Sequence, residues 1–148
     1  MLEHINLIEL FKRSTYLYVF LFSFNGLYKY KVEIVMARIK RYCGPYVIEI
    51  SGGRYKDYCG PYTHELVGDK VKRYCGPYLY EIQGDRIKQY CGPYLLEIQG
   101  DKIKRYCGPY IAEIQGNRIK QYCGPYLYEI EGAISHQELM GLIAILFA

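Results

Sequence analysis

Residues 86–101 read RIKQYCGPYLLEIQGD, and the chain carries six tandem copies of this sixteen-residue pattern. A unit of this size cannot bury its apolar face alone, so neighbouring copies have to pack together around one core. The chain has 148 residues, about the length of one domain, and 51% of them are hydrophobic. The repeat therefore governs the fold. Its copies begin at Arg38, Arg54, Lys70, Arg86, Lys102 and Arg118.

Each copy contains two turn signals separated by short apolar runs. Gly84-Asp85 is typical of a two-residue hairpin loop in which glycine takes a positive φ. Gly92-Pro93 is typical of a turn with glycine at its first central position. The six-residue runs between the turns are rich in Ile, Tyr and Leu and have the length of strands. The six copies therefore predict twelve antiparallel strands.

The register across Gly84-Asp85 follows from the sequence. Ile82 faces Ile87 on one side of the hairpin, and Glu81 faces Lys88 on the other. Across the Gly-Pro turn, the same alternation predicts that Ile87 faces Ile98 and that Lys88 faces Glu97, so both turns assign residues to the same sides. The charge pairing recurs as Glu65–Lys72, Glu97–Lys104 and Glu113–Lys120.

Twelve strands in an open sheet would leave two exposed edges, which favour aggregation. Pairing residues 38–43 with residues 126–131 removes both edges and repeats the hairpin register, because Lys40 then faces Glu129. We expect an all-β fold of six hairpins closed into a shallow twelve-stranded barrel with pseudo-sixfold symmetry. An open meander is the alternative, and a strand from residues 30–35 between the two ends would make thirteen.

Residues 1–35 form an N-terminal extension of different character. Apolar positions over residues 2–11 predict a short amphipathic helix. Residues 16–24 are apolar, too short for a membrane span, and similar to a signal-peptide core without a cleavage site. Residues 30–34 resemble a repeat strand, as a diverged copy of the repeat would. Met36 is an alternative start of the protein.

Residues 134–148 follow the six-repeat segment of residues 36–133. Ser135 and Glu138 predict a capped helix, and the apolar residues after them predict burial in protein or in lipid. A twelve-stranded ring has a lumen roughly 12–14 Å wide, and a helix is about 10–12 Å across, so the helix fits as a plug. Its expected partners are Ile39, Val71, Ile87 and Ile103.

Membrane insertion is the rival role for this helix. The inward side of the strands also carries polar residues, and burying charges beside an apolar helix is costly unless they pair or reach water. The helix is too short to span a bilayer. The polar residues on the inward side are expected to be Arg41, Asp57, Arg73, Gln89, Arg105 and Gln121.

The six cysteines lie sixteen residues apart. Equivalent positions in adjacent hairpins are roughly 9.6 Å apart, whereas a disulfide needs Cα atoms within about 7 Å. We therefore expect free thiols, facing inward beside the turns, in a reducing compartment. Thiols around a ring do not converge on zinc. His4, His64 and His136 are isolated, so no catalytic, metal or cofactor site and no enzymatic activity are expected.

One end of the hairpins has the character of an interaction surface. At the Cys-Gly-Pro end, the charged side of the sheet becomes aromatic and aliphatic, so both sides are apolar there. Such a belt above a charged band is typical of contact with a membrane interface or a partner, unless residues 1–35 cover it. The expected rim consists of Tyr42, Tyr58, Tyr74, Tyr90, Tyr106, Tyr122, Leu79, Leu95, Ile111 and Leu127.

The repeats resemble those of the β-flower proteins, in which a basic-Ile-x-x-aromatic strand, a glycine-containing turn and a Leu-Tyr-x-Ile-x-Gly-Asp/Asn strand alternate. The resemblance covers about residues 38–133, and the Cys-Gly-Pro turn departs from the family pattern. It implies a bacterial, shallow, rotationally symmetric barrel. This architecture is similar to the tubby C-terminal domain, a lipid-binding barrel with a central helix, which implies lipid or membrane association.

We therefore expect a non-enzymatic module that binds lipid or a membrane surface, in the cytoplasm or at the cytoplasmic face of the membrane. A scaffold for protein interaction or assembly is the alternative. Single-stranded nucleic-acid binding through Tyr, Lys and Arg is less favoured. The net charge of +4 is compatible with an anionic surface. No cofactor is expected, and the sequence leaves the oligomeric state open.

Overall fold

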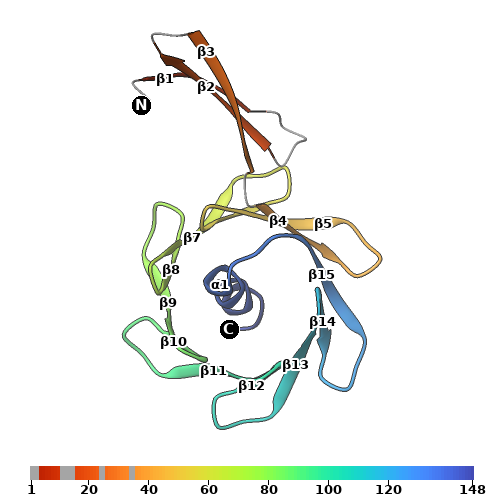
Figure 1. Cartoon of the computed structure of the whole chain (residues 1–148). Coiled ribbons are helices and arrows are strands. Elements are labelled where there is room, and N and C mark those ends of the chain that lie inside the picture. The colour runs from red at the N-terminus through yellow and green to blue at the C-terminus, as the bar shows by residue number, and fades with distance from the viewer. Residues whose placement is uncertain (1–3, 11–15, 24–25, 34–35) are drawn as a thin grey trace. The chain divides into compact units, whose positions relative to one another are not determined.

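The computed structural model describes residues 4–10, 16–23, 26–33 and 36–148, and it places side chains from residue 36 onward. The chain divides into two compact units, Met1–Met36 and Ala37–Ala148. The first unit is an antiparallel sheet of β1 (His4–Leu10), β2 (Tyr16–Ser23) and β3 (Gly26–Glu33), in the order β1-β2-β3 (Figure 1).

The helix predicted over residues 2–11 is wrong, because residues 4–10 form strand β1. Strand β1 pairs along its length with β2, where Ile8 faces Val19. Pairing with a neighbouring strand overrides a weak helical periodicity in so short a segment. Of the possible thirteenth strand over residues 30–35, residues 30–33 form part of β3 and belong to this sheet and not to the ring, and residues 34–35 lie outside the described residues.

The second unit is a closed barrel of twelve antiparallel strands, as the repeat predicts (Figure 1). The ring closes where β15 pairs with β4, with Ile130 opposite Ile39 and Glu129 opposite Lys40. The strands are β4 (Met36–Arg41), β5 (Tyr46–Ser51), β6 (Arg54–Asp57), β7 (Tyr62–Val67), β8 (Lys70–Arg73), β9 (Tyr78–Gln83), β10 (Arg86–Gln89), β11 (Tyr94–Gln99), β12 (Lys102–Arg105), β13 (Tyr110–Gln115), β14 (Arg118–Gln121) and β15 (Tyr126–Gly132).

The Gly-Asp turns have the predicted register. Across Gly84-Asp85, Ile82 faces Ile87 and Glu81 faces Lys88, and Gly84 has a φ of 59°. The Asp85 carbonyl also accepts a hydrogen bond from the Ile98 amide, which ties this turn to the next hairpin. The predicted pairs Glu65–Lys72, Glu97–Lys104 and Glu113–Lys120 all occur.

Alternation along the strands separates the core from a charged outer wall. The first strand of each repeat (β4, β6, β8, β10, β12 and β14, here called the short strands) has a completely buried inward residue at its centre. On the outer wall, Lys88 and Glu81 form an ion pair of 3.9 Å. Such partly exposed pairs contribute little stability, so the apolar interior supplies most of it. The buried inward residues of the short strands are Ile39, Tyr55, Val71, Ile87, Ile103 and Ile119.

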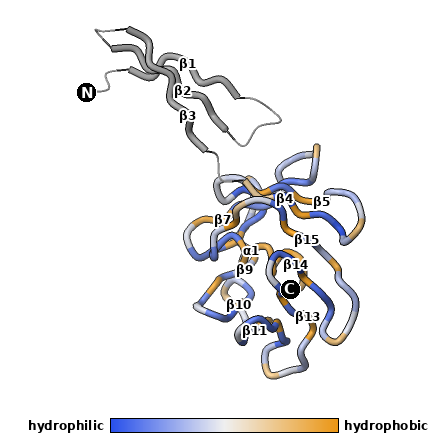
Figure 2. Tube along the Cα trace, turned by 45° about the vertical axis from the view of Figure 1, so that its right-hand side comes forward, coloured by the Kyte–Doolittle hydropathy of each residue, from blue (hydrophilic) through white to orange (hydrophobic). Residues whose placement is uncertain are grey.

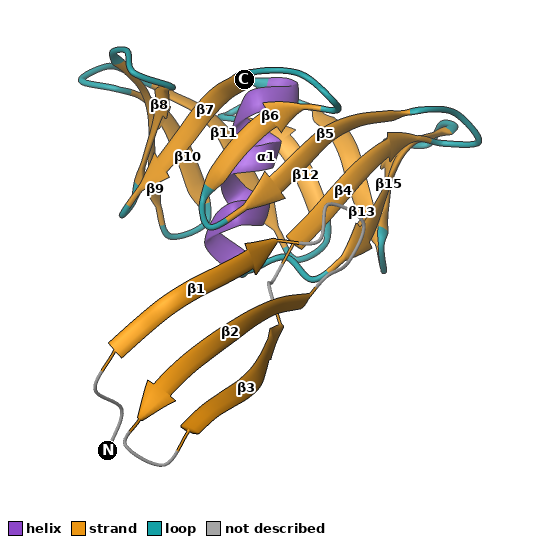
Figure 3. Ribbon diagram, turned by 90° about the horizontal axis from the view of Figure 1, so that it is seen from above, coloured by secondary structure: helices purple, strands orange, loops and turns teal. Residues whose placement is uncertain are grey.

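Helix α1 (His136–Phe147) runs through the barrel, which confirms the predicted plug (Figure 3). Ser135 caps it and forms the predicted capping box with Glu138. Met140, Leu142, Ile143 and Ala144 of the helix are buried in one cluster with the predicted partners Ile39, Val71, Ile87 and Ile103, and hydrophobic colouring runs along α1 in Figure 2. Each buried Leu, Ile or Met side chain contributes about 1.5–3 kcal/mol, so the plug is a major part of the core.

The polar residues predicted on the inward side of the strands are not buried beside the helix. They occupy the last position of each short strand, where the barrel opens, and their side chains are exposed to water. Arg105 lies at this rim and donates a hydrogen bond of 3.0 Å to the Phe147 carbonyl at the end of α1. A cation at a helix C-terminus is favourable because the last carbonyls carry partial negative charge.

Candidate functional site

The hairpin tips at the Cys-Gly-Pro end contain a different turn from the predicted one. In one copy, the Gly92 amide donates to the Gln89 carbonyl at 2.9 Å, so Tyr90 and Cys91 are the central residues. Cys91 has a φ of 53°, and the other five cysteines have nearly the same value. The prediction of glycine at the first central position is therefore wrong, and cysteine takes the left-handed conformation.

The glycine of this turn is required by space and not by its φ. A Cβ atom at Gly108 would lie 2.8 Å from the Cβ of Arg105, and one at Gly92 would lie 3.0 Å from the Cβ of Gln89. The chain folds back on itself so closely that only glycine fits without a shift. Each tip therefore combines a sterically required glycine with a cysteine in a backbone conformation that non-glycine residues rarely adopt.

Two features change the predicted register: each turn is centred on its cysteine and not on Gly-Pro, and a β-bulge follows each of the five tips from Cys59 to Cys123. Ile87 faces Leu96 and not Ile98, and the pairing then shifts so that Lys88 faces Tyr94. The extra residue, Leu95, is half-buried and packs against the core. The alternation across the tip was compatible with either register in the sequence, because Leu95 and Leu96 are both apolar. The bulge therefore changes the direction in which the side chains before Leu95 point.

The structure divides the predicted rim into two sets. The turn tyrosines Tyr42, Tyr58, Tyr74, Tyr90 and Tyr106 are between 37 and 40% exposed, and Tyr122 is half-buried. The aliphatic residues Leu79, Leu95, Ile111 and Leu127 are half-buried, and Leu95 and Ile111 contact the core. The exposed part of the rim is therefore mainly aromatic.

Each turn tyrosine stacks on a second tyrosine, which the sequence analysis missed. Tyr90 lies against Tyr78 with ring centroids 5.0 Å apart. Tyr78 follows the proline of the preceding tip, and the sixteen-residue spacing of these residues could have revealed the pairing. The post-proline tyrosines are Tyr46, Tyr62, Tyr78, Tyr94, Tyr110 and Tyr126.

Basic residues of the outer wall lie over these pairs of rings. The Arg86 guanidinium is 5.6 Å from the Tyr94 centroid and 5.7 Å from that of Tyr106. Arg86 is also 3.9 Å from a carboxylate oxygen of Glu97, and the Tyr94 hydroxyl donates to Gln83. The cations of the wall are therefore largely occupied by aromatic rings and carboxylates.

The inner side of the same rim carries a different set of charges. Arg41, Arg73 and Arg105 are exposed and face inward, because Arg41 pairs with Tyr128 and Arg105 with Leu96. Within the described part of the chain, none of the three forms an ion pair. Asp57 is the one acidic residue at this repeat position. The inner rim therefore has a net positive charge beside the apolar end of α1.

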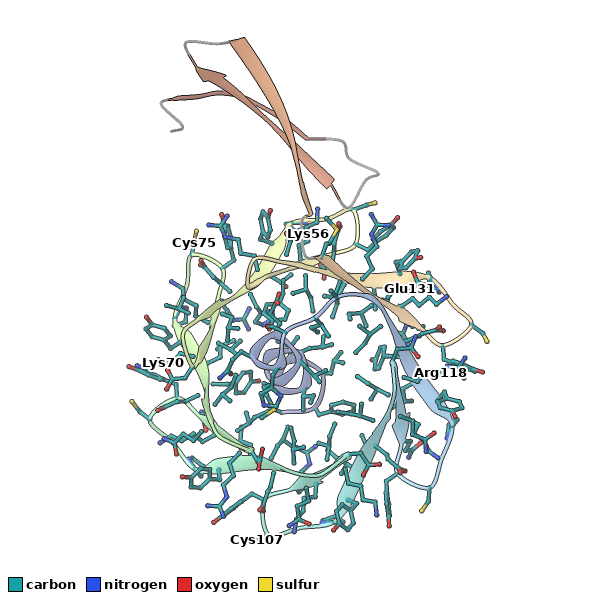
Figure 4. The ribbon with its side chains drawn as sticks, viewed as in Figure 1. Lys56, Lys70, Cys75, Cys107, Arg118 and Glu131 are labelled. Carbon is teal, nitrogen blue, oxygen red and sulfur yellow. The ribbon has the colours of Figure 1, made fainter. Side chains whose placement is uncertain are left out.

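All six thiols are free and exposed, which corrects the expectation that they face inward. Cys75 and Cys107 lie at the outermost points of the splayed tips in Figure 4. The tips project away from the barrel axis because the bulges and tight turns bend the strands outward there. No cluster among the described residues has three or more ligands for a metal ion.

The three histidines are isolated from one another. His64 faces the interior, and burial, followed by the charge of Arg73, lowers the pKa of its imidazole. His136 lies at the start of α1 at the other rim, and His4 has no described side chain. The chain matches no protein-family model, no curated protein and no solved structure.

Proposed function

We propose that this chain is a β-flower protein that binds anionic membrane surfaces through the rim of Cys-Gly-Pro tips. One observation carries the proposal. A single rim combines exposed tyrosines, three arginines without an ion pair in the described structure, and the apolar end of α1. The ring of six hairpins around a central helix supports the family assignment.

Tyrosine and arginine suit the two parts of a lipid–water boundary. A tyrosine ring is apolar with a polar hydroxyl, and it is enriched where hydrocarbon meets headgroups. An arginine guanidinium binds phosphate with several donors. Each basic residue near an anionic surface contributes about 1 kcal/mol, so three arginines in one ring give useful affinity.

The proposed contact is peripheral. Helix α1 lies within the barrel, and its half-buried end residues Leu146 and Phe147 are level with the arginines of the rim. No helix in the described part of the chain has the length and apolar character that a membrane crossing requires. Exposed free thiols favour a reducing compartment, so we place the contact at the cytoplasmic face.

Vesicle co-sedimentation tests this proposal. We expect binding to vesicles of phosphatidylcholine and phosphatidylglycerol at 50 mM salt, weaker binding at 500 mM salt, and little binding to phosphatidylcholine alone. Single-stranded DNA is added as a competitor. Equal binding to both lipid mixtures, or loss of vesicle binding when DNA is added, would contradict the proposed surface.

Two triple variants locate the surface. Tyr74, Tyr90 and Tyr106 are replaced by Ser, and separately Arg41, Arg73 and Arg105 are replaced by Gln. Both variants should lose most of the vesicle binding. The matched control replaces Lys88, Lys104 and Lys120 by Gln, which removes the same charge from the outer wall. A control variant that loses as much binding as the arginine variant would mean that net charge alone is responsible.

The alternative, an assembly scaffold, is favoured by a separate observation. Strands β1 and β3 each have one pairing partner in the described structure, so their sheet presents two edges. A strand from a partner can add to such an edge through backbone hydrogen bonds. A variant without residues 1–35 that still binds vesicles but loses self-association would assign the two roles to the two units.

A further inference from the structure

The helix is not held equally by all sides of the barrel. Tyr55 takes the position that Ile or Val holds in the other short strands, and it is completely buried. Its hydroxyl donates a hydrogen bond of 2.7 Å to the Glu138 carbonyl. Gly141 of α1 makes room for this ring, because a Cβ atom there would overlap the Tyr55 hydroxyl. This contact fixes α1 against β6.

A pocket lies on the other side of the helix. In the closed ring of twelve strands, β12 is six strands away from β6 in both directions, so the two face each other across the lumen. The pocket has a volume of about 260 Å³ and straddles β12 between β11 and β13. It is lined by Ile98, Gly100, Asp101, Ile114, His136, Leu139, Met140 and Ile143.

Two features accompany this pocket. Ile98 and Ile114, which line it, are half-buried at an inward repeat position, as is Leu66 of β7, whereas Ile50, Ile82 and Ile130 are buried there. At the neighbouring inward position, β13 carries a small residue, Ala112. The other copies have Ile48, His64, Tyr80, Leu96 and Tyr128 there.

The lining has an apolar interior and a polar side. Isoleucine, leucine and methionine side chains surround the interior, and methionine adapts its shape to different ligands. Gly100, Asp101 and His136 form the polar part of the lining, at the rim away from the cysteines. Asp101 is exposed and forms no ion pair within the described part of the chain, so its carboxylate can pair with a ligand cation at this side of the pocket.

We propose that this pocket binds a small organic amine with an apolar body. The apolar body fills the space beside Met140 and Ile143, and the ammonium group pairs with Asp101. An apolar cavity of about 150 Å³ holds benzene, so 260 Å³ accepts an aromatic ring with a short alkyl chain. The site is separate from the proposed membrane-binding rim and does not depend on it.

Three probes with the same phenylethyl body test the chemistry: 2-phenylethylamine, 2-phenylethanol and 3-phenylpropionate. Binding is measured by NMR from the methyl signals of Ile98, Ile114 and Met140. The amine should bind about fivefold more tightly than the alcohol, the factor that one ion pair at 4 Å supplies in water. The acid should bind more weakly than both. Equal binding of all three would overturn the amine assignment, and no shifts at millimolar concentrations would overturn the site.

Matched variants separate the pocket from non-specific binding. Asp101→Asn should make the amine and the alcohol bind equally, whereas Asp85→Asn, at the same position of another turn, should change nothing. Ile98→Phe should weaken all probes at least fivefold by filling the pocket. Leu66→Phe, at the equivalent half-buried position of β7, should not. Loss of probe binding in the control variants, or its persistence in Ile98→Phe, would contradict the proposed site.

Discussion

The two rims of the barrel are built from the same twelve strands but by different turns. At the Gly-Asp rim, glycine supplies a positive φ and the strands pair without interruption. At the Cys-Gly-Pro rim, cysteine supplies the positive φ, glycine supplies space, and bulges bend the strands outward. The turns of the first rim only connect neighbouring strands. The second exposes aromatic rings, thiols and arginines that the fold alone does not require.

The largest expected effect comes from removing the helix that joins the two rims. Deletion of residues 135–148 removes the buried side chains of Met140, Leu142 and Ile143. Their loss costs about 5–9 kcal/mol, comparable with the whole stability of a domain. We expect the melting temperature to fall by about 20 °C or more and a hydrophobic dye to bind the lumen. Unchanged stability with loss of vesicle binding would mean that the helix is an anchor.

Glycine substitutions test the difference between the turns. Gly108→Ala should lower the free energy of unfolding by about 1–3 kcal/mol because of the contact with the Arg105 Cβ. Gly100→Ala should lower it by about 1–2 kcal/mol because of its φ of 65°. Asn tolerates this φ, so Gly100→Asn should be milder than Gly100→Ala, whereas Gly108→Asn should give no relief. Chemical denaturation measures all four, and relief at both positions would refute the distinction.

Replacing a tip cysteine should stabilise the barrel. Cys91 has a φ of 53°, which a side chain such as Asn tolerates better than most. We expect Cys91→Asn to raise the free energy of unfolding by up to about 1 kcal/mol and Cys91→Ala to leave it nearly unchanged. A thermal melt distinguishes the two. If Asn destabilises the tip more than Ala, then the backbone conformation of Cys91 is not what limits the stability of the tip.

The smallest expected effect lies at the seam between β15 and β4. Tyr46 donates to Glu131, where three other copies have a glutamine, and this hydrogen bond, followed by that from Lys40, lowers the pKa of the Glu131 carboxyl. A lowered pKa stabilises the fold above the unfolded value, and this stabilisation is lost as the pH falls through the folded value. Tyr46→Phe should therefore raise the Glu131 pKa and lower the melting temperature at pH 7.

The control for this seam is Tyr94→Phe, which removes a hydrogen bond to the neutral Gln83. The effect of Tyr46→Phe on the melting temperature should become smaller as the pH falls below the ordinary range of a glutamate carboxyl, whereas that of Tyr94→Phe should not depend on pH. A Tyr46→Phe effect that does not change with pH would mean that the ring, and not the charged hydrogen bond, stabilises the seam.

Local rules explain which parts of this structure could be predicted from the sequence. The Gly-Asp register, the closure at Lys40 and Glu129 and the cap at Ser135 each follow from residues whose preferences agree with one another. The bulge at Leu95 could not be predicted because two adjacent apolar residues fit either register. The strand at residues 4–10 was missed because pairing with β2 determines it.

The candidate sites show the same division. The turn tyrosines were predicted from their spacing, and their stacking partners lie across the Gly-Asp hairpins, whose register also follows from the sequence. The exposure of the thiols was missed because the glycine of the turn was assigned the φ that Cys91 has. The pocket beside β12 was not predictable, because its lining residues from β11, β13 and α1 meet only once the helix has packed inside the barrel.

The most direct measurement compares the two rims on a membrane. In a background with the other five cysteines replaced by Asn, a nitroxide is attached to Cys91. A second protein has all six cysteines replaced and carries the nitroxide at Asp85→Cys. With anionic vesicles, the label at Cys91 should collide more with oxygen dissolved in the membrane and less with a water-soluble nickel chelate, and the label at position 85 should not change. A change at position 85 instead, or no change at either position in vesicle-bound protein, would contradict the assignment of the cysteine rim as the membrane-binding surface.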